Sequence, residues 1–183
     1  MILRFLSHRL SGIAGWEATI IVVALHFLVS FMVDRISYPV LWKLYWPMRL
    51  RKFEQNGELY DKVFKIKQWK QYIPAIGPFD KKHLVERPDK RYFSVYLLEN
   101  LRADLYHQLM VVVFFVLTFL FPDAFRERLL IWNFLINVPC IMIQRFNRPR
   151  IERALQRLTG TKEPELSLFW LPDEEAAAPL YRR

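Results

Sequence analysis

Several residue types and motifs that define common soluble enzymes are scarce or missing in this chain of 183 residues. It has one cysteine, Cys140, so no intrachain disulfide can support the fold. The four histidines and the cysteine show no metal-ligand spacing, and we expect no metal site. The sequence also lacks a Gly-rich phosphate loop, a G-x-S-x-G elbow, an H-E-x-x-H motif and the His-x4-Asp pattern of glycerolipid acyltransferases. Any catalytic site in this chain must therefore use residues outside these motifs.

Hydrophobic residues make up 53% of the chain, and they are gathered in blocks. The block at 13–32 is about 30 Å long as a helix, which matches a hydrocarbon core. No small-x-small cleavage site follows it, so we expect an uncleaved membrane helix. Blocks at 105–121 and 129–143 are joined by a short link, which favours an antiparallel hairpin that spans the membrane or re-enters. The chain is thus predicted to be all-α: a small helical integral membrane protein, one domain over 1–183, with about three membrane-embedded helices and interfacial amphipathic segments.

Positive charge lies between and after the apolar blocks, and the net charge is +9. This placement is typical of the positive-inside rule and of contact with anionic lipid, so we expect no nucleic-acid partner. Region 34–104 combines Trp and Tyr with Lys and is predicted to be cytoplasmic and interfacial. The C-terminal tail should share that side, with residues 163–183 poorly ordered. The expected location is a bacterial inner membrane, crossed several times.

The first polar cluster lies where a predicted cytoplasmic helix enters the 105–121 block. On that helix, Glu99 and Arg102 are neighbours at i, i+3, and so are Asp104 and His107. A carboxylate that orients a histidine supports a general base. These four residues are the candidate catalytic group. The alternative is a helix end decorated with interfacial polar groups and salt bridges.

The second cluster follows the 129–143 block. Asn137 lies inside that block, and Arg145, Arg148 and Arg150 follow it. Arginine binds phosphate through charge-assisted hydrogen bonds, and Asn147 could cap a helix whose N-terminus attracts anions. These residues, with Trp69, are predicted to bind the substrate or donor. The alternative is a basic anchor after a membrane span for the arginines, and an interface anchor for Trp69.

The run from Ile136 to Arg150 resembles the N-V-P-x4-Q-R-[FY]-N-R-P-R signature of the glycosyl-4,4'-diaponeurosporenoate acyltransferase family. Further similarities keep the same order over about 46–158: Phe53-Glu54 with Gly57, Lys67 to Lys70, His83-Leu84, and the segment Glu99 to His107. The chain differs from the staphyloxanthin-pathway member in having Asp104 in place of Glu, and in its longer tail.

The resemblance implies a membrane acyltransferase that esterifies a fatty acyl chain to a sugar hydroxyl of a carotenoid glycoside or related glycolipid. His107, oriented by Asp104 or Glu99, would be the base, the arginines would hold donor phosphates, and Asn137 or Asn147 would donate to the oxyanion. The expected co-substrate is acyl-CoA or another acyl thioester, with no tightly bound cofactor. Expected partners are membrane lipids, a hydrophobic glycoside acceptor and the donor, and a homo-oligomer or pathway complex stays open.

Two other functions also fit the sequence. A non-enzymatic membrane adaptor would use the basic surface to bind anionic lipid or a biosynthetic partner enzyme. A component of a small lipid or sugar transporter is disfavoured because the chain has few spans.

Overall fold

The computed structural model describes residues 15–73, 89–119 and 123–161, and all regular secondary structure in these ranges is helical. The predicted all-α class is therefore confirmed. The chain forms two compact units: unit 1 is Met1–Arg35 with Asp104–Ile141, and unit 2 is Ile36–Ala103 with Met142–Arg183. The tail at 163–183, expected to be poorly ordered, and His83 lie outside the described residues.

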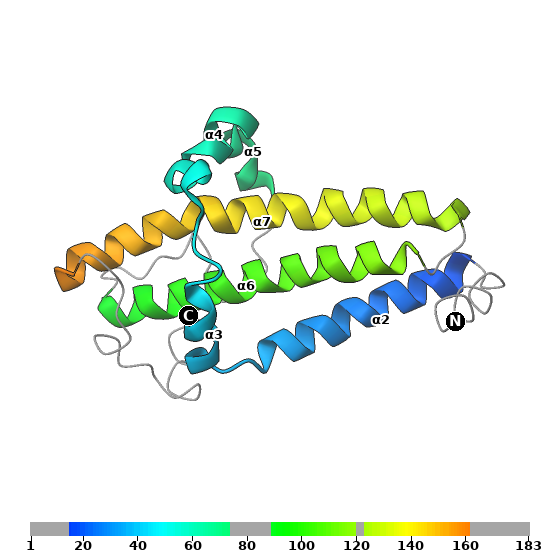
Figure 1. Ribbon diagram of the computed structural model, residues 1–183, viewed down its shortest axis with the longest axis horizontal. Coiled ribbons are helices and arrows are strands. Elements are labelled where there is room, and N and C mark those ends of the chain that lie inside the picture. The colour runs from blue at the N-terminus through cyan, green and yellow to red at the C-terminus, as the bar shows by residue number, and fades with distance from the viewer. Residues whose placement is uncertain (1–14, 74–88, 120–122, 162–183) are drawn as a thin grey trace. The chain divides into compact units, whose positions relative to one another are not determined.

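Unit 1 is built from three helical segments (Figure 1). They are α2 (Gly15–Asp34), residues 104–117 of α6 (Lys90–Leu117), and residues 123–141 of α7 (Asp123–Thr159). Met110, Phe114 and Leu129 form its buried centre, and Ile21, Val22 and Val29 of α2 pack against them. Packing of α2 against both other helices thus organises this unit.

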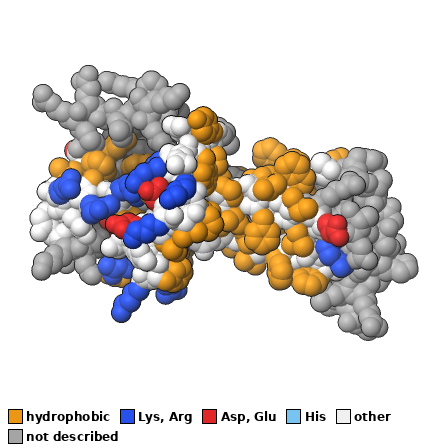
Figure 2. Space-filling model, turned by 90° about the horizontal axis from the view of Figure 1, so that it is seen from above, with side chains coloured by type: hydrophobic (Ala, Val, Ile, Leu, Met, Phe, Trp, Pro, Cys, Tyr) orange, Lys and Arg blue, Asp and Glu red, His pale blue; other side chains and the backbone are white. Residues whose placement is uncertain are grey.

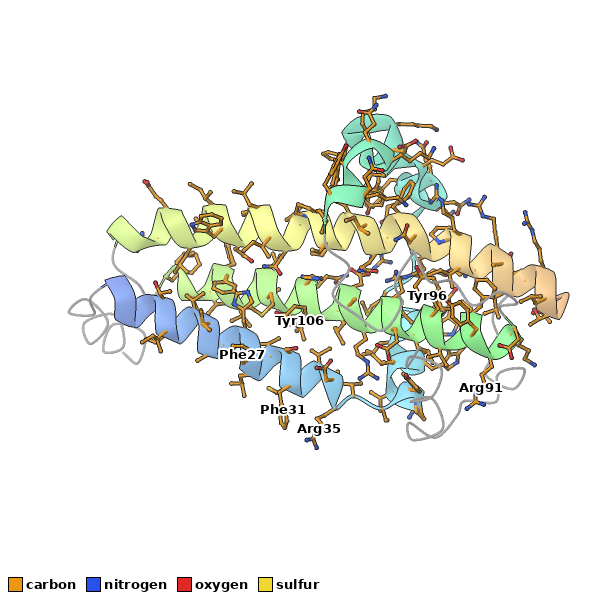
Figure 3. The ribbon with its side chains drawn as sticks, turned by 180° about the vertical axis from the view of Figure 1, so that it is seen from behind. Phe27, Phe31, Arg35, Arg91, Tyr96 and Tyr106 are labelled. Atoms are coloured by element: carbon orange, nitrogen blue, oxygen red, sulfur yellow. The ribbon has the colours of Figure 1, made fainter. Side chains whose placement is uncertain are left out.

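The outer surface of unit 1 is apolar, as Figure 2 shows by its hydrophobic side chains. Phe27 is 73% exposed and Phe31 56% exposed, and Figure 3 shows both on the side of α2 that points away from α6. Arg35 ends this row with its guanidinium over the Phe31 ring at 4.5 Å. Such a surface is costly in water and favourable in lipid, where a terminal arginine reaches toward headgroups. Other large apolar residues exposed on this unit are Ile20, Val23, Leu28, Met32, Leu109, Val112, Phe115, Val116, Phe119, Ile131, Trp132, Phe134, Leu135 and Ile136.

Unit 2 contains the remaining parts of α6 and α7 together with several short helices. These are α3 (Tyr38–Tyr45), the 3₁₀ helix η1 (Lys52–Gly57), α4 (Glu58–Phe64), α5 (Ile66–Trp69) and the 3₁₀ helix η2 (Lys70–Tyr72). Its core residues include Leu41, Ile66, Leu101, Phe146 and Leu155, each at most 1% exposed. Like unit 1, it also buries polar and charged side chains, which are described below.

The helix α7 continues through Pro139 and Pro149. Proline has no N–H, so Pro149 leaves the carbonyl of Arg145 without its usual intrahelical donor. Gly57 lies against this point: a Cβ on Gly57 would be 3.2 Å from the carbonyl oxygens of Arg145 and Phe146. Gly57 also has φ +84°, a conformation that side chains rarely adopt. The glycine therefore allows η1 to pack closely on α7.

The helices extend beyond the apolar blocks from which the sequence predicted them. The sequence placed membrane helices at 13–32, 105–121 and 129–143, with a helical pattern from Tyr92 into the second block and an amphipathic helix over 151–158. The structure joins these segments into α6, which begins at Lys90, and α7, which continues to Thr159. No helix begins at Asn147, so the cap expected there is wrong. The extensions form because polar residues such as Asn100 and Arg148 have hydrogen-bond partners inside unit 2.

Two of the described helices are long and apolar enough to cross a membrane, namely α6 and residues Leu129–Thr159 of α7. A third span results if α2 and α3 are counted together as one broken span. Length and composition thus indicate a helical membrane protein.

Candidate active site

His107 and Asn137 form the central polar contact of unit 1. His107 lies on α6 and Asn137 on α7, and His107 Nδ1 is 2.9 Å from Asn137 Oδ1. Asn137 is 1% exposed, whereas His107 is half-buried. A polar pair inside an apolar helical unit is costly unless its groups are satisfied, so this pair is the candidate functional site of unit 1.

A chain of amides determines which nitrogen of His107 carries the proton. Asn133 Nδ2 donates to the carbonyl oxygen of Val111, an atom that can only accept. Asn133 Oδ1 must then face Asn137, and it accepts from Asn137 Nδ2 at 2.8 Å. Asn137 consequently presents Oδ1 to the imidazole, so His107 Nδ1 must be the donor. The neutral ring therefore has its lone pair on Nε2, the arrangement that a general base needs.

This geometry changes the orienting residue expected from the sequence. Asp104 is fully buried one helical turn before His107, and its Oδ1 accepts from Gln108 Nε2 at 2.8 Å. The imidazole donates through Nδ1 to Asn137 Oδ1, while the amide nitrogen of Asn137 donates to Asn133. Asn137 thus positions the histidine, in place of the oxyanion contact expected for it.

Glu99 and Arg102 belong to unit 2, where they join α6 to α3. Tyr38 donates to Glu99 Oε1 at 2.9 Å, and Arg102 Nε is 3.4 Å from the same oxygen. The Arg102 guanidinium also lies over the Tyr38 ring at 5.3 Å. The four residues predicted as one catalytic cluster are therefore divided between the two units, with Asp104 and His107 in unit 1.

Arg145 forms a buried ion pair with Glu54. Its Nε and Nη2 donate to the two oxygens of Glu54 at 2.5 and 2.7 Å, and Glu54 is 1% exposed. Tyr60 donates to Glu54 as well. Burial raises the pKa of the Glu54 carboxyl, but the hydrogen bonds from Arg145, Tyr60 and the Arg51 backbone outweigh it and hold that pKa below 4.5. Burial and the bond to Glu54 raise the pKa of Tyr60 to about 12.

Arg148 is fully buried in unit 2. It donates to Asn100 Oδ1 at 3.1 Å and to the carbonyl oxygen of Met48 at 2.7 Å. Asn100 in turn donates to Gln144 Oε1 at 2.7 Å. Arg145 and Arg148 therefore bind the protein's own oxygens and hold unit 2 together, and the donor-binding role predicted for them gains no support from these contacts.

Arg150, Asn147 and Trp69 lie nearer the surface of unit 2. The Arg150 guanidinium lies 3.6 Å from the centroid of the Phe146 ring, and Lys70 Nζ lies 4.6 Å from it. Lys70 also donates to Asn147 Oδ1 at 3.2 Å. Trp69 Nε1 donates to the carbonyl oxygen of Phe64, which fixes the bend between α4 and α5. Binding of substrate or donor by these residues stays a prediction.

Three residues important to these clusters had no role in the sequence-based site. Asn133 completes the amide chain, and the signal for it was a second asparagine four residues before Asn137 in an apolar helix. Glu54 and Lys70 lie within motifs that resemble the family, but their contacts with Arg145 and Phe146 could not be read from spacing. Among the described residues no group of three or more His, Cys, Asp or Glu could hold a metal ion.

Fold and site define a class: a helical membrane protein with an amide-oriented histidine in its apolar unit. Residues 42–157 match the sequence profile of the glycosyl-4,4'-diaponeurosporenoate acyltransferase family, and the chain belongs to this family of acyltransferases. A relative of that name from Staphylococcus haemolyticus (strain JCSC1435) is 30% identical over 139 residues, which cover 70% of this chain and 77% of the relative. Another from Staphylococcus aureus (strain USA300) is 26% identical over 111 residues, or 58% and 66% of the two chains. No solved structure matches the chain.

Proposed function

We propose that this protein is a membrane acyltransferase that esterifies a fatty acyl chain to a sugar hydroxyl of a carotenoid glycoside or related glycolipid. The relatives are named for an acyltransferase of glycosyl-4,4'-diaponeurosporenoate, which supports a carotenoid glycoside as acceptor. The observation that carries the proposal is the contact between His107 Nδ1 and Asn137 Oδ1. It leaves Nε2 of the histidine as a base inside an apolar unit.

The proposed reaction is acyl transfer from a thioester, either acyl-CoA or an acyl carrier. His107 Nε2 removes the proton from the acceptor hydroxyl while the oxygen attacks the thioester carbonyl. Collapse of the tetrahedral intermediate breaks the C–S bond, and the imidazolium returns its proton to the leaving sulfur. The products are the ester and the free thiol.

Asn137 and Asp104 have different tasks in this mechanism. The neutral amide of Asn137 holds the imidazole in one orientation but adds no charge. The Asp104 carboxylate, three residues before His107, supplies the negative charge that favours the transient imidazolium.

The apolar surface of unit 1 supports a lipid-soluble acceptor. An acceptor with a long hydrocarbon tail dissolves in the bilayer and reaches the site from there, while the thioester donor comes from water. We place the protein in the bacterial inner membrane, with the basic region 34–104 and the C-terminal tail cytoplasmic, because Lys and Arg concentrate in these segments.

The direct test is the substitution His107→Ala, assayed in membranes that contain a glycosylated carotenoid and acyl-CoA, with the ester detected by mass spectrometry. Loss of a positioned base lowers the rate by about 10²–10⁴-fold. The matched control is His26→Leu, because His26 is the other described histidine of unit 1 and packs on the Phe114 ring. Wild-type rates for His107→Ala, in protein that folds normally, would remove this residue from the mechanism.

A further inference from the structure

Two cations of unit 2 converge on one aromatic ring. Lys70 Nζ and the Arg150 guanidinium carbon lie 4.6 and 3.6 Å from the centroid of Phe146, so they are at most 8.2 Å apart. Both side chains are held in place. Lys70 donates to Asn147 Oδ1, and Arg150 Nη1 donates to the carbonyl oxygen of Phe146. The two positive groups are therefore held near one ring, although like charges repel.

The carboxylates of the neighbouring short helices form ion pairs with nearby lysines, and Asp61 and Glu58 also lie close enough to attract the charge of Arg150. Glu58 pairs with Lys62 at 3.2 Å, and Asp61 pairs with Lys67 at 2.7 Å. Glu54 is 1% exposed and bound by Arg145. Arg153 adds a further positive charge one turn after Arg150, where its Nε donates to the carbonyl oxygen of Pro149. This part of unit 2 thus has an excess of positive charge.

An anion placed between two such cations is stabilised by both. Because Lys70 and Arg150 are at most 8.2 Å apart, one phosphate group can accept charge-assisted hydrogen bonds of about 2.8 Å from both. Both residues are also partly exposed, so a ligand can reach them from solvent. Arg145 and Arg148 cannot provide this function without leaving their buried contacts.

From this geometry we propose that Lys70 and Arg150, held on the ring of Phe146, form a binding site for a phosphate group. This inference rests on the proposed function in one respect: it assigns that phosphate to the acyl thioester donor. Thioester donors carry phosphate in coenzyme A or in the prosthetic arm of a carrier protein, whereas the sugar acceptor needs none. The other source of the same chemistry is the headgroup of an anionic phospholipid.

The test measures binding of coenzyme A to the full-length protein in phosphatidylcholine nanodiscs by calorimetry. Lys70→Ala and Arg150→Ala should each weaken binding about tenfold, since a charge-assisted hydrogen bond is worth about that factor. Arg150→Lys keeps a cation and should lose less affinity for coenzyme A than Arg150→Ala. The matched control is Lys43→Ala, because Lys43 is an exposed lysine on α3 of the same unit and its loss removes the same net charge.

A second arm repeats the measurement in nanodiscs that contain phosphatidylglycerol. If phosphatidylglycerol leaves the binding of coenzyme A unchanged, the site belongs to the donor. If phosphatidylglycerol weakens the binding of coenzyme A in wild type but not in Lys70→Ala, the site belongs to the lipid headgroup. Equal weakening by Lys43→Ala, or no change in Lys70→Ala and Arg150→Ala, would overturn the site. Failure of acyl transfer is a separate result: a protein that binds coenzyme A normally but transfers no acyl chain contradicts the proposed function and leaves the phosphate site intact.

Discussion

His107 and Asn137 are 30 residues apart in the sequence, and their ring nitrogen and amide oxygen lie 2.9 Å apart between α6 and α7. In the proposed mechanism Asn137 takes no direct part in proton transfer. Its value lies in the tautomer that it imposes, because an imidazole with Nδ1 protonated has only Nε2 with which to accept a proton. The predictions about activity follow from this relationship, and those about stability follow from the buried contacts of unit 2.

Replacing Asn137 by Leu should lower the rate of acyl transfer about tenfold or more, yet by less than loss of the base itself. The side chain of leucine has similar volume but cannot accept the Nδ1 proton, so both tautomers and several ring orientations become populated. Asn137→Asp restores an acceptor and should retain more activity than Asn137→Leu. The measurement is the initial rate in membranes, and equal rates for wild type and Asn137→Leu would contradict the positioning role.

Arg145→Met should lower the free energy of unfolding by about 3–5 kcal/mol, because it leaves the Glu54 carboxylate buried without its guanidinium. The double variant Arg145→Met with Glu54→Leu should be more stable than Arg145→Met alone, since no unpaired charge then remains. Chemical unfolding in a mild detergent measures the free energy of unfolding of the single and the double variant. Lys62→Met is the comparison: it breaks the exposed pair with Glu58 and should cost under about 1 kcal/mol.

Acid should destabilise the protein partly through Glu54. Its pKa in the folded state is below the ordinary 4.5, so its contribution to stability is fully present above that pH and is lost as the pH falls through the folded-state pKa. Unfolding midpoints measured from pH 7 down to acid should therefore fall more steeply in wild type than in Glu54→Gln. Parallel curves for the two proteins would show that another group controls the acid transition.

Gly57→Ala should be more destabilising than Gly160→Ala, by at least about 1 kcal/mol. Both glycines have positive φ, at +84° and +72°, so both substitutions carry the same kind of backbone cost. Only at Gly57 does the new Cβ meet backbone, at 3.2 Å from the carbonyl oxygens of Arg145 and Phe146, whereas nothing lies within 4 Å at Gly160. The midpoint of thermal unfolding compares the two, and similar values would mean that η1 does not need this close packing.

Part of the site could be predicted because its signals are local. His107 stood out as a histidine at the entrance to an apolar block, and Asp104 lay one turn away. The contact between His107 and Asn137 could not be predicted, because neighbours on one helix are visible in a sequence whereas neighbours on different helices are not. The same limitation explains why all three arginines were predicted to bind phosphate. A sequence does not show that Arg145 and Arg148 form hydrogen bonds with buried oxygens of the protein itself.

The amino-acid sequence by itself determined the all-α membrane class, because the order of residues gathers apolar side chains into blocks, and the block at 13–32 is about as long as a bilayer is thick. It also determined the family, since the run from Asn137 to Arg150 is long and unusual. Only the tertiary structure decided that Asn137 orients His107, that Arg145 binds Glu54, and that Lys70 joins Arg150 on one ring. The physical reason is that hydrophobicity acts through local pattern, whereas hydrogen bonds and ion pairs require atoms from distant segments to come within about 3 Å of each other.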